Sequence, residues 1–140
     1  MKPFENVVGK TLIDIRIDPE DCLTLYTDDG KQERVYAEGE CCSEAWFSDL
    51  EMFGSMPTIV RSVQLSKDEI VPEHKMDKNR QEEEKVSFIT INTNNGHISL
   101  TLRNSSNGYY GACIIVEGSR YNKDRPIYPG DCVNEEDYGL

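Results

Sequence analysis

The sequence predicts an α+β domain rich in antiparallel strands, with about seven strands and one short helix. Three observations predict this class. Apolar residues recur mainly with a period of two, turn signals of the Asp-Gly and Asn-Gly kind separate the alternating segments, and one stretch has the composition of a capped helix. A chain of 140 residues can bury one proper core, so we expect a single domain over residues 1–140.

The first forty residues predict a three-stranded meander. Ile13, Ile15 and Ile17 alternate with charged residues, so we expect them on one face of the first strand. The stretch Asp28–Gly30 is a hairpin signal between the second and third strands. The three predicted strands are residues 10–18, 22–27 and 31–38.

One short helix is predicted from Ser43 to Phe53. Ser43 is a good N-cap, the two residues after it favour helices, and Gly54 is a natural stop. We expect this helix to bury Trp46 or Phe47 against the strands.

A second meander is predicted in the later half. Residues 58–65 form a strand, residues 85–103 form a hairpin around Asn94–Gly96, and the apolar run Ala112–Val116 completes the set. Two polar segments are expected to lack regular structure because they hold too few apolar residues to offset their ordering entropy. They are a charged loop over residues 67–85 and a tail over residues 119–140.

The composition narrows the class of partner. The net charge is −11, from 26 acids against 15 bases, which disfavours duplex nucleic acid and acidic membranes. Such a chain can imitate nucleic acid toward a basic partner, or bind a small anion where a few arginines gather. No apolar run of about 18 residues and no secretory leader are present, so we expect a soluble protein that stays in the compartment where it is made.

Catalytic and metal-binding signals are sparse. The five cysteines show no CxxC spacing, and Cys22 and Cys113 are expected to be core residues. His74 lies in the charged loop and His97 beside a hairpin turn, and no nucleophile elbow, Walker loop or dinucleotide fingerprint occurs. We therefore expect a protein that is not an enzyme and that holds no metal or cofactor.

The best candidate for a binding site is the stretch RNSSNGYYGA, residues 103–112. Arg103 can bind a phosphate, a tyrosine ring can stack on a base, and amides and hydroxyls can bind sugar and base edges. An ordinary turn explains the Asn, Ser and Gly content equally well, and one of the adjacent tyrosines is expected in the core. The predicted ligand-binding residues are Arg103, Asn104, Ser105, Asn107, Tyr109, Tyr110, Phe88, Asn92 and Arg61.

The set GKTL, GECCSEAWFSDL and RNSSNGYYGA, spread over residues 7–118, resembles a group of small phage and prophage proteins that includes the Thoeris anti-defence sponges. The resemblance implies a phage product that binds a cyclic ADP-ribose isomer without cleaving it, in the cytoplasm of a bacterial host. It also implies a homo-oligomer with pockets between subunits, and in some members a separate place for cyclic oligonucleotides. The arginines that would have to converge are Arg61, Arg103, Arg120 and Arg125.

Two other classes stay open. One is an acidic protein inhibitor that mimics nucleic acid. The other is a phage or bacterial accessory domain without a ligand, in which RNSSNGYYGA is a turn and CCSEAWFSDL packs against the core.

Overall fold

The computed structural model describes residues 2–40, 43–76, 83–107, 111–117 and 126–134. This part of the chain is β-rich, as predicted, but it contains ten strands rather than about seven and no α-helix. A single 3-10 turn, η1, spans Glu73–Lys75. The strands are β1 (Thr11–Ile17), β2 (Cys22–Thr27), β3 (Gln32–Gly39), β4 (Glu44–Phe53), β5 (Thr58–Leu65), β6 (Glu69–Ile70), β7 (Glu83–Thr93), β8 (Gly96–Ser106), β9 (Ala112–Val116) and β10 (Cys132–Asn134).

All strand pairs are antiparallel and belong to one sheet in the order β4-β8-β7-β5-β1-β2-β3-β9, with β6 beside β7 and β10 beside β5. The predicted meander β1-β2-β3 and the predicted hairpin β7-β8 are confirmed. The predicted second meander is wrong in its last strand pair, because β9 pairs with β3 and not with β8. Pairing of β5 with β1 joins the two halves of the sheet.

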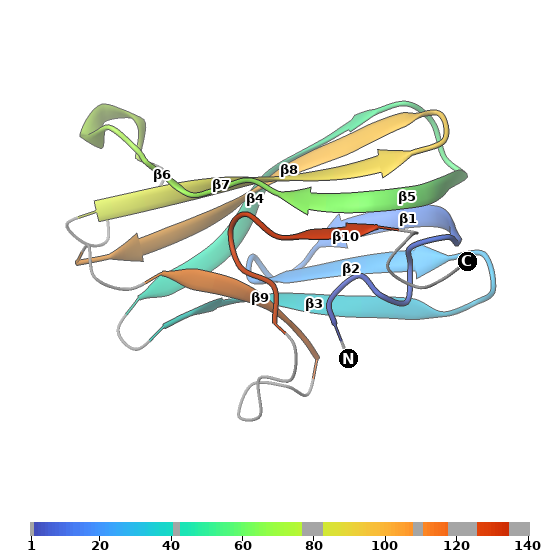
Figure 1. The fold of residues 1–140 in the computed structure, drawn as a ribbon, viewed down its shortest axis with the longest axis horizontal. Coiled ribbons are helices and arrows are strands. Elements are labelled where there is room, and N and C mark those ends of the chain that lie inside the picture. Colours follow the sequence, from blue (N-terminus) through green and yellow to red (C-terminus); the bar gives the residue numbers. More distant parts are fainter. Residues whose placement is uncertain (1, 41–42, 77–82, 108–110, 118–125, 135–140) are drawn as a thin grey trace.

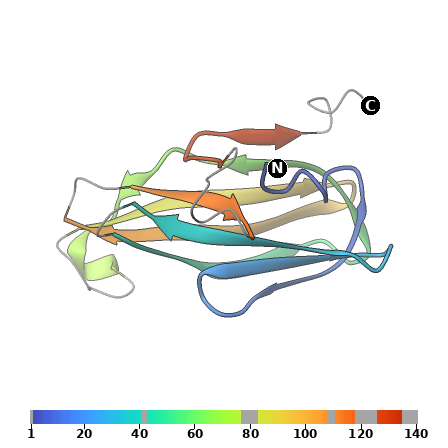
Figure 2. The same cartoon turned by 90° about the horizontal axis from the view of Figure 1, so that it is seen from below.

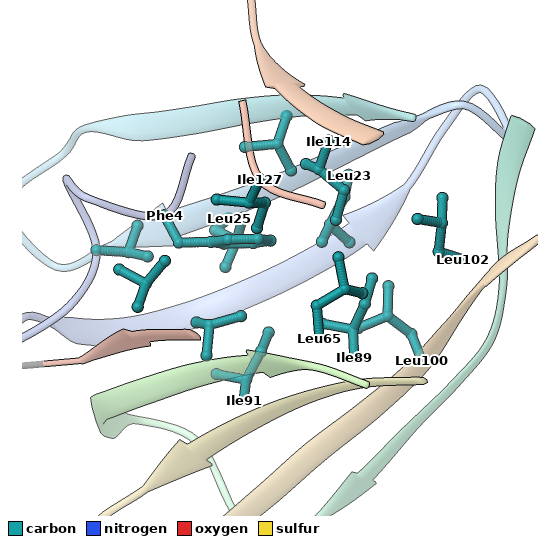
Figure 3. Packing of buried hydrophobic residues seen from close by; sticks show 14 of the residues in the cluster. Phe4, Leu23, Leu25, Leu65, Ile89, Ile91, Leu100, Leu102, Ile114 and Ile127 are labelled. Atoms are coloured by element: carbon teal, nitrogen blue, oxygen red, sulfur yellow. The ribbon is translucent and has the colours of Figure 1, made fainter. Parts of the chain in front are cut away.

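The sheet curls over so that its two halves face each other across the core (Figures 1 and 2). Side chains from β2 and β9 point toward side chains from β5, β7 and β8, while Phe4 and Ile127 lie beside the β2 group (Figure 3). Cys22 and Cys113 are buried, as predicted. The central buried residues include Leu23, Leu25, Ile114, Leu65, Ile89, Ile91 and Leu100.

The predicted helix over Ser43–Phe53 is wrong, because Glu44–Phe53 is strand β4. This strand pairs with β8 along most of its length, which satisfies its backbone groups better than an isolated short helix can. Phe47 joins the core, and Trp46 is paired with Arg103 on the opposite face. Both rings are buried, so their burial was predicted correctly, although they lie on a strand and not on a helix.

The prediction that Ile13, Ile15 and Ile17 share one face of β1 is wrong at Ile13. The register between β1 and β2 shifts between Leu12 and Asp14. A bulge of this kind reverses the alternation. As a result Leu12 is fully buried and Ile13 is 48% exposed, while Ile15 and Ile17 share one face, as predicted, and pack against the core.

The two segments predicted to be irregular contain regular structure. Within residues 67–85 the chain forms β6, the turn η1 and the start of β7, while residues 77–82 lie outside the described part. Within residues 119–140, Ile127 pairs with Ile114 and β10 pairs with β5. Residues 118–125 and 135–140 lie outside the described part.

Candidate functional site

The pairing of β7 with β8 decides which predicted site residues share a surface. Ile98, Leu100 and Leu102 of β8 point into the core, so Arg103 and Ser105 lie on the outer face and Asn104 on the inner face. The same alternation on β7 places Phe88 and Asn92 on the outer face. Four of the predicted residues therefore share the outer face, and Asn104 does not.

Arg103 is held by contacts within the chain. Its Nε donates to Ser48 Oγ at 2.7 Å and its Nη2 donates to Asp49 Oδ2 at 2.9 Å, both on β4. Its Nη1 donates to Glu84 Oε2 on β7 at 3.0 Å. The Arg103 side chain is 16% exposed and the Glu84 side chain is 0% exposed, so this ion pair is buried. Arg103 thus ties together three neighbouring strands.

The local backbone of β4 brings its acceptors to Arg103. Asp49 has a φ of 56°, in the left-handed region that Asp tolerates better than most residues. The register between β4 and β8 shifts between Ser48 and Glu51, around this residue. The hydrogen bond from Arg103 lowers the pKa of Asp49, with a smaller contribution from Ser48. The motifs CCSEAWFSDL and RNSSNGYYGA therefore meet as neighbouring strands held by one guanidinium.

Asn104 ties the start of β4 to the segment before β9. Its Nδ2 donates to the carbonyl oxygens of Glu44 at 3.2 Å and Gly111 at 3.4 Å. Ser43 Oγ also donates to the Gly111 carbonyl, at 3.0 Å. A cavity of about 10 Å³ borders Asn104 and Lys85. Its volume fits about one water molecule and no organic ligand.

A larger, open cavity of about 320 Å³ lies on the outer face beside Phe88. The Phe88 ring is 49% exposed. Cys132 of β10 pairs with Gln64 of β5, and Gln64 pairs with Thr90 of β7, so these three side chains form a row across the cavity floor. The volume falls within the range of small-molecule sites. The residues that line this cavity, the Phe88 cavity, are Gln64, Leu65, Ser66, Phe88, Thr90, Gly130, Asp131 and Cys132.

One wall of the Phe88 cavity is a turn that the sequence analysis missed. Asp131 N donates to Tyr128 O at 3.0 Å, and Gly130 has a φ of 100°. With Pro129 at the second position and glycine at the third, this is a type II turn. The Pro129-Gly130 pair is a recognisable turn signal, and it could have identified the wall in a tail predicted to be irregular.

Of the other predicted site residues, those that the structure describes lie outside the lining of the Phe88 cavity. Asn92 is next to it, and its Nδ2 donates to Ser62 Oγ at 2.9 Å. Arg61 is exposed at a bulge of β5, and Asn107 is exposed just after β8. Tyr109 and Tyr110 lie outside the described residues.

A third cavity, of about 130 Å³, contains the buried carboxyl group of Glu33. Lys10 and Lys31 line the same cavity. Burial raises the pKa of Glu33 to about 7, and the backbone N–H groups of Asn6 and Phe4 offset only part of this rise. The cavity lies against the turn that precedes β1, away from the outer face of β7 and β8.

Within the described ranges, no group of three or more His, Cys, Asp or Glu side chains could hold a metal ion. No helix in the same ranges is long and apolar enough to cross a membrane. His97 stacks on Phe53, with ring centroids 4.7 Å apart, and neither His97 nor His74 lines the Phe88 cavity.

The family model that describes a domain of unknown function (DUF7448) matches residues 5–116. One similar protein is "Uncharacterized protein L278" of Acanthamoeba polyphaga mimivirus. It is 34% identical over 101 residues, which cover 69% of this chain and 75% of the relative. No solved structure gives a significant match. Because the family model and the viral relative both cover most of the chain, this protein belongs to the DUF7448 family.

Proposed function

We propose that this protein binds a small nucleotide of the cyclic ADP-ribose type in the Phe88 cavity and releases it chemically unchanged. The observation that carries the proposal is the half-exposed Phe88 ring at the border of a 320 Å³ cavity. Stacking a base on an aromatic ring is worth about 1–3 kcal/mol. The remaining lining provides the hydrogen-bonding groups that a sugar and a base edge require.

The row Thr90, Gln64 and Cys132 supplies a hydroxyl, an amide and a thiol at fixed spacing, because each belongs to a hydrogen-bonded strand. The amide of Gln64 both donates and accepts, and the hydroxyl of Thr90 does the same. A nucleobase edge presents both kinds of group. The sheet therefore offers a preformed surface, and binding would require little ordering of side chains.

A phosphate group needs a cation, and one candidate is Lys67. A Cβ atom built on Gly130 would lie 3.6 Å from Lys67 Cγ, so the Lys67 side chain passes beside the cavity wall. Arg103, the first choice from the sequence, lies on the same face, but each of its three guanidinium nitrogens donates to a partner within the chain. Phosphate binding by Arg103 stays a prediction, and the proposal does not depend on it.

The biological role that we propose is sequestration of a nucleotide immune signal during viral infection, with the protein in the cytoplasm of the infected host. The similarity to a mimivirus protein is compatible with a viral role. Sequestration needs affinity and no chemistry, and the described residues that line the Phe88 cavity include no histidine beside Cys132 to act as a base. A homo-oligomer and a second site for cyclic oligonucleotides belong to the same proposal.

A thermal-shift panel tests this function, with cyclic ADP-ribose isomers, linear ADP-ribose and cyclic dinucleotides as the probes. A ligand at a hundred times its dissociation constant stabilises the folded state by about 2.7 kcal/mol. We expect a cyclic ADP-ribose isomer to raise the melting temperature and to be recovered intact by chromatography after the protein is denatured. A panel without any shift, or recovery of a hydrolysed product, would contradict the proposal.

A further inference from the structure

The wall of the Phe88 cavity is firmly attached to the sheet. Gly130 N donates to Leu65 O at 2.7 Å, and Leu65 N donates to Asp131 O at 2.9 Å. The wall then continues into β10, where Val133 is fully buried and pairs with Val63. Residues 126–134, which we call the C-terminal strap, therefore form a rigid part of the cavity.

The strap lies beyond the part of the chain that the family model matches, which ends at residue 116. Phe88, Thr90 and Gln64 lie within the matched part. The floor of the cavity thus belongs to the family domain, whereas one wall comes from a segment outside it. Sequence changes in this wall can therefore alter which ligand binds without altering the family domain that forms the floor.

We propose that the C-terminal strap determines which nucleotide the cavity accepts, and that Asp131 is the residue that selects a ribose by accepting hydrogen bonds from its hydroxyl groups. This inference rests on the proposed function of the Phe88 cavity. Asp131 supplies the carboxylate of the lining, which includes no Lys or Arg among the described residues. A carboxylate accepts hydrogen bonds and repels phosphate, so the sugar rather than the phosphate faces this wall.

The Asp131 carboxylate is held in position for this role. Its Oδ2 accepts a hydrogen bond from Tyr128 N at 2.8 Å, within the type II turn. A carboxylate has about four lone-pair positions, so this bond leaves acceptors for a ligand. Acidic residues bind ribose hydroxyls in the same way in dinucleotide-binding folds.

The test compares Asp131→Asn with the parent by calorimetry, using cyclic ADP-ribose and its 2′-deoxy analogue as the probes. The amide keeps an oxygen that can accept from Tyr128 N, so the turn is expected to survive and the melting temperature to stay unchanged. Asp28→Asn, at the exposed hairpin turn before β3, is the matched control. We expect Asp131→Asn to weaken cyclic ADP-ribose binding by about ten- to a hundredfold, because a charged hydrogen bond is lost.

The 2′-deoxy analogue separates ribose selection from a general loss of binding. It should bind the parent weakly, and Asp131→Asn should weaken its binding much less than that of cyclic ADP-ribose. Equal losses for both probes, or no loss for either, would overturn the role of Asp131 while leaving the proposed function intact. If the parent protein binds neither probe, the proposed function fails and this inference fails with it.

Discussion

The two ends of the outer face of β7 and β8 differ in what their side chains do. At the Arg103 end, each of the three guanidinium nitrogens donates to a partner within the chain, namely Ser48, Glu84 or Asp49. At the Phe88 end, an aromatic ring is half exposed beside a cavity of about 320 Å³.

The difference shows that a charged residue in a recognisable motif can serve the fold while a less noticeable residue on the same strands lines an open cavity. Arg103 joins three strands, so its removal should affect stability first. Phe88 is half exposed beside the cavity, so its removal should affect binding more than stability.

The largest effect is expected from Arg103→Gln, which leaves the Glu84 carboxylate buried without its cation. Breaking a buried ion pair from one side costs about 3–5 kcal/mol. The free energy of unfolding, measured by urea denaturation, should fall by about that amount. The double variant Glu84→Gln with Arg103→Gln should recover much of the loss, because no charge remains buried. If the Arg103→Gln variant is as stable as the parent but no longer binds nucleotide, Arg103 binds the phosphate and does not mainly stabilise the sheet.

Glu33 can be compared with Glu84, because both carboxyl groups are buried but, among the described residues, only Glu84 is paired with an arginine. Its pKa is about 7 in the folded protein and 4.5 in a free side chain. As the pH rises from about 4.5 to 7, the unfolded chain loses this proton while the folded chain retains it, so stability falls over this window. Above pH 7 the loss of folding stability from Glu33 is complete and amounts to about 3 kcal/mol.

The variant Glu33→Gln removes this titration. It should flatten the fall in stability between pH 5 and pH 8, and it should be more stable than the parent at pH 8 by up to about 3 kcal/mol. Urea denaturation at the two pH values measures this effect. Glu69→Gln, at an exposed position of β6, is the control and should follow the parent. A parent whose stability rises over the same window would contradict the assignment to Glu33.

Local sequence patterns predicted the β-hairpins well, because alternation and Asn-Gly or Asp-Gly turns act over a few residues. The helix prediction failed at Ser43, where a good N-cap precedes a strand whose partner, β8, lies about 50 residues later in the sequence. Pairing of β9 with β3 could not be predicted for the same reason. The bulge at Leu12 depends on a register that the sequence of β1 alone does not define.

The candidate site was predicted in part. Phe88 and Asn92 were correctly placed on one face of a hairpin, because their spacing follows the strand period. Phosphate binding by Arg103 stays a prediction, and the sequence did not show that Asp49 and Glu84 converge on this residue. The Asp131 wall was missed because it depends on a tertiary contact between Gly130 and Leu65, although its turn signal was visible.

We propose that Phe88 binds the ligand, whereas the Arg103 network stabilises the sheet. Phe53 offers a matched control, because its ring is 48% exposed and lies on β4, away from the lining of the Phe88 cavity. The most direct measurement is the calorimetric dissociation constant of cyclic ADP-ribose for the parent, Phe88→Ala and Phe53→Ala.

We predict that Phe88→Ala weakens binding by about five- to 150-fold, from the loss of about 1–3 kcal/mol of stacking, with an almost unchanged melting temperature. Phe53→Ala should bind as the parent does. Equal affinities for all three proteins would contradict the claim and place the site away from Phe88.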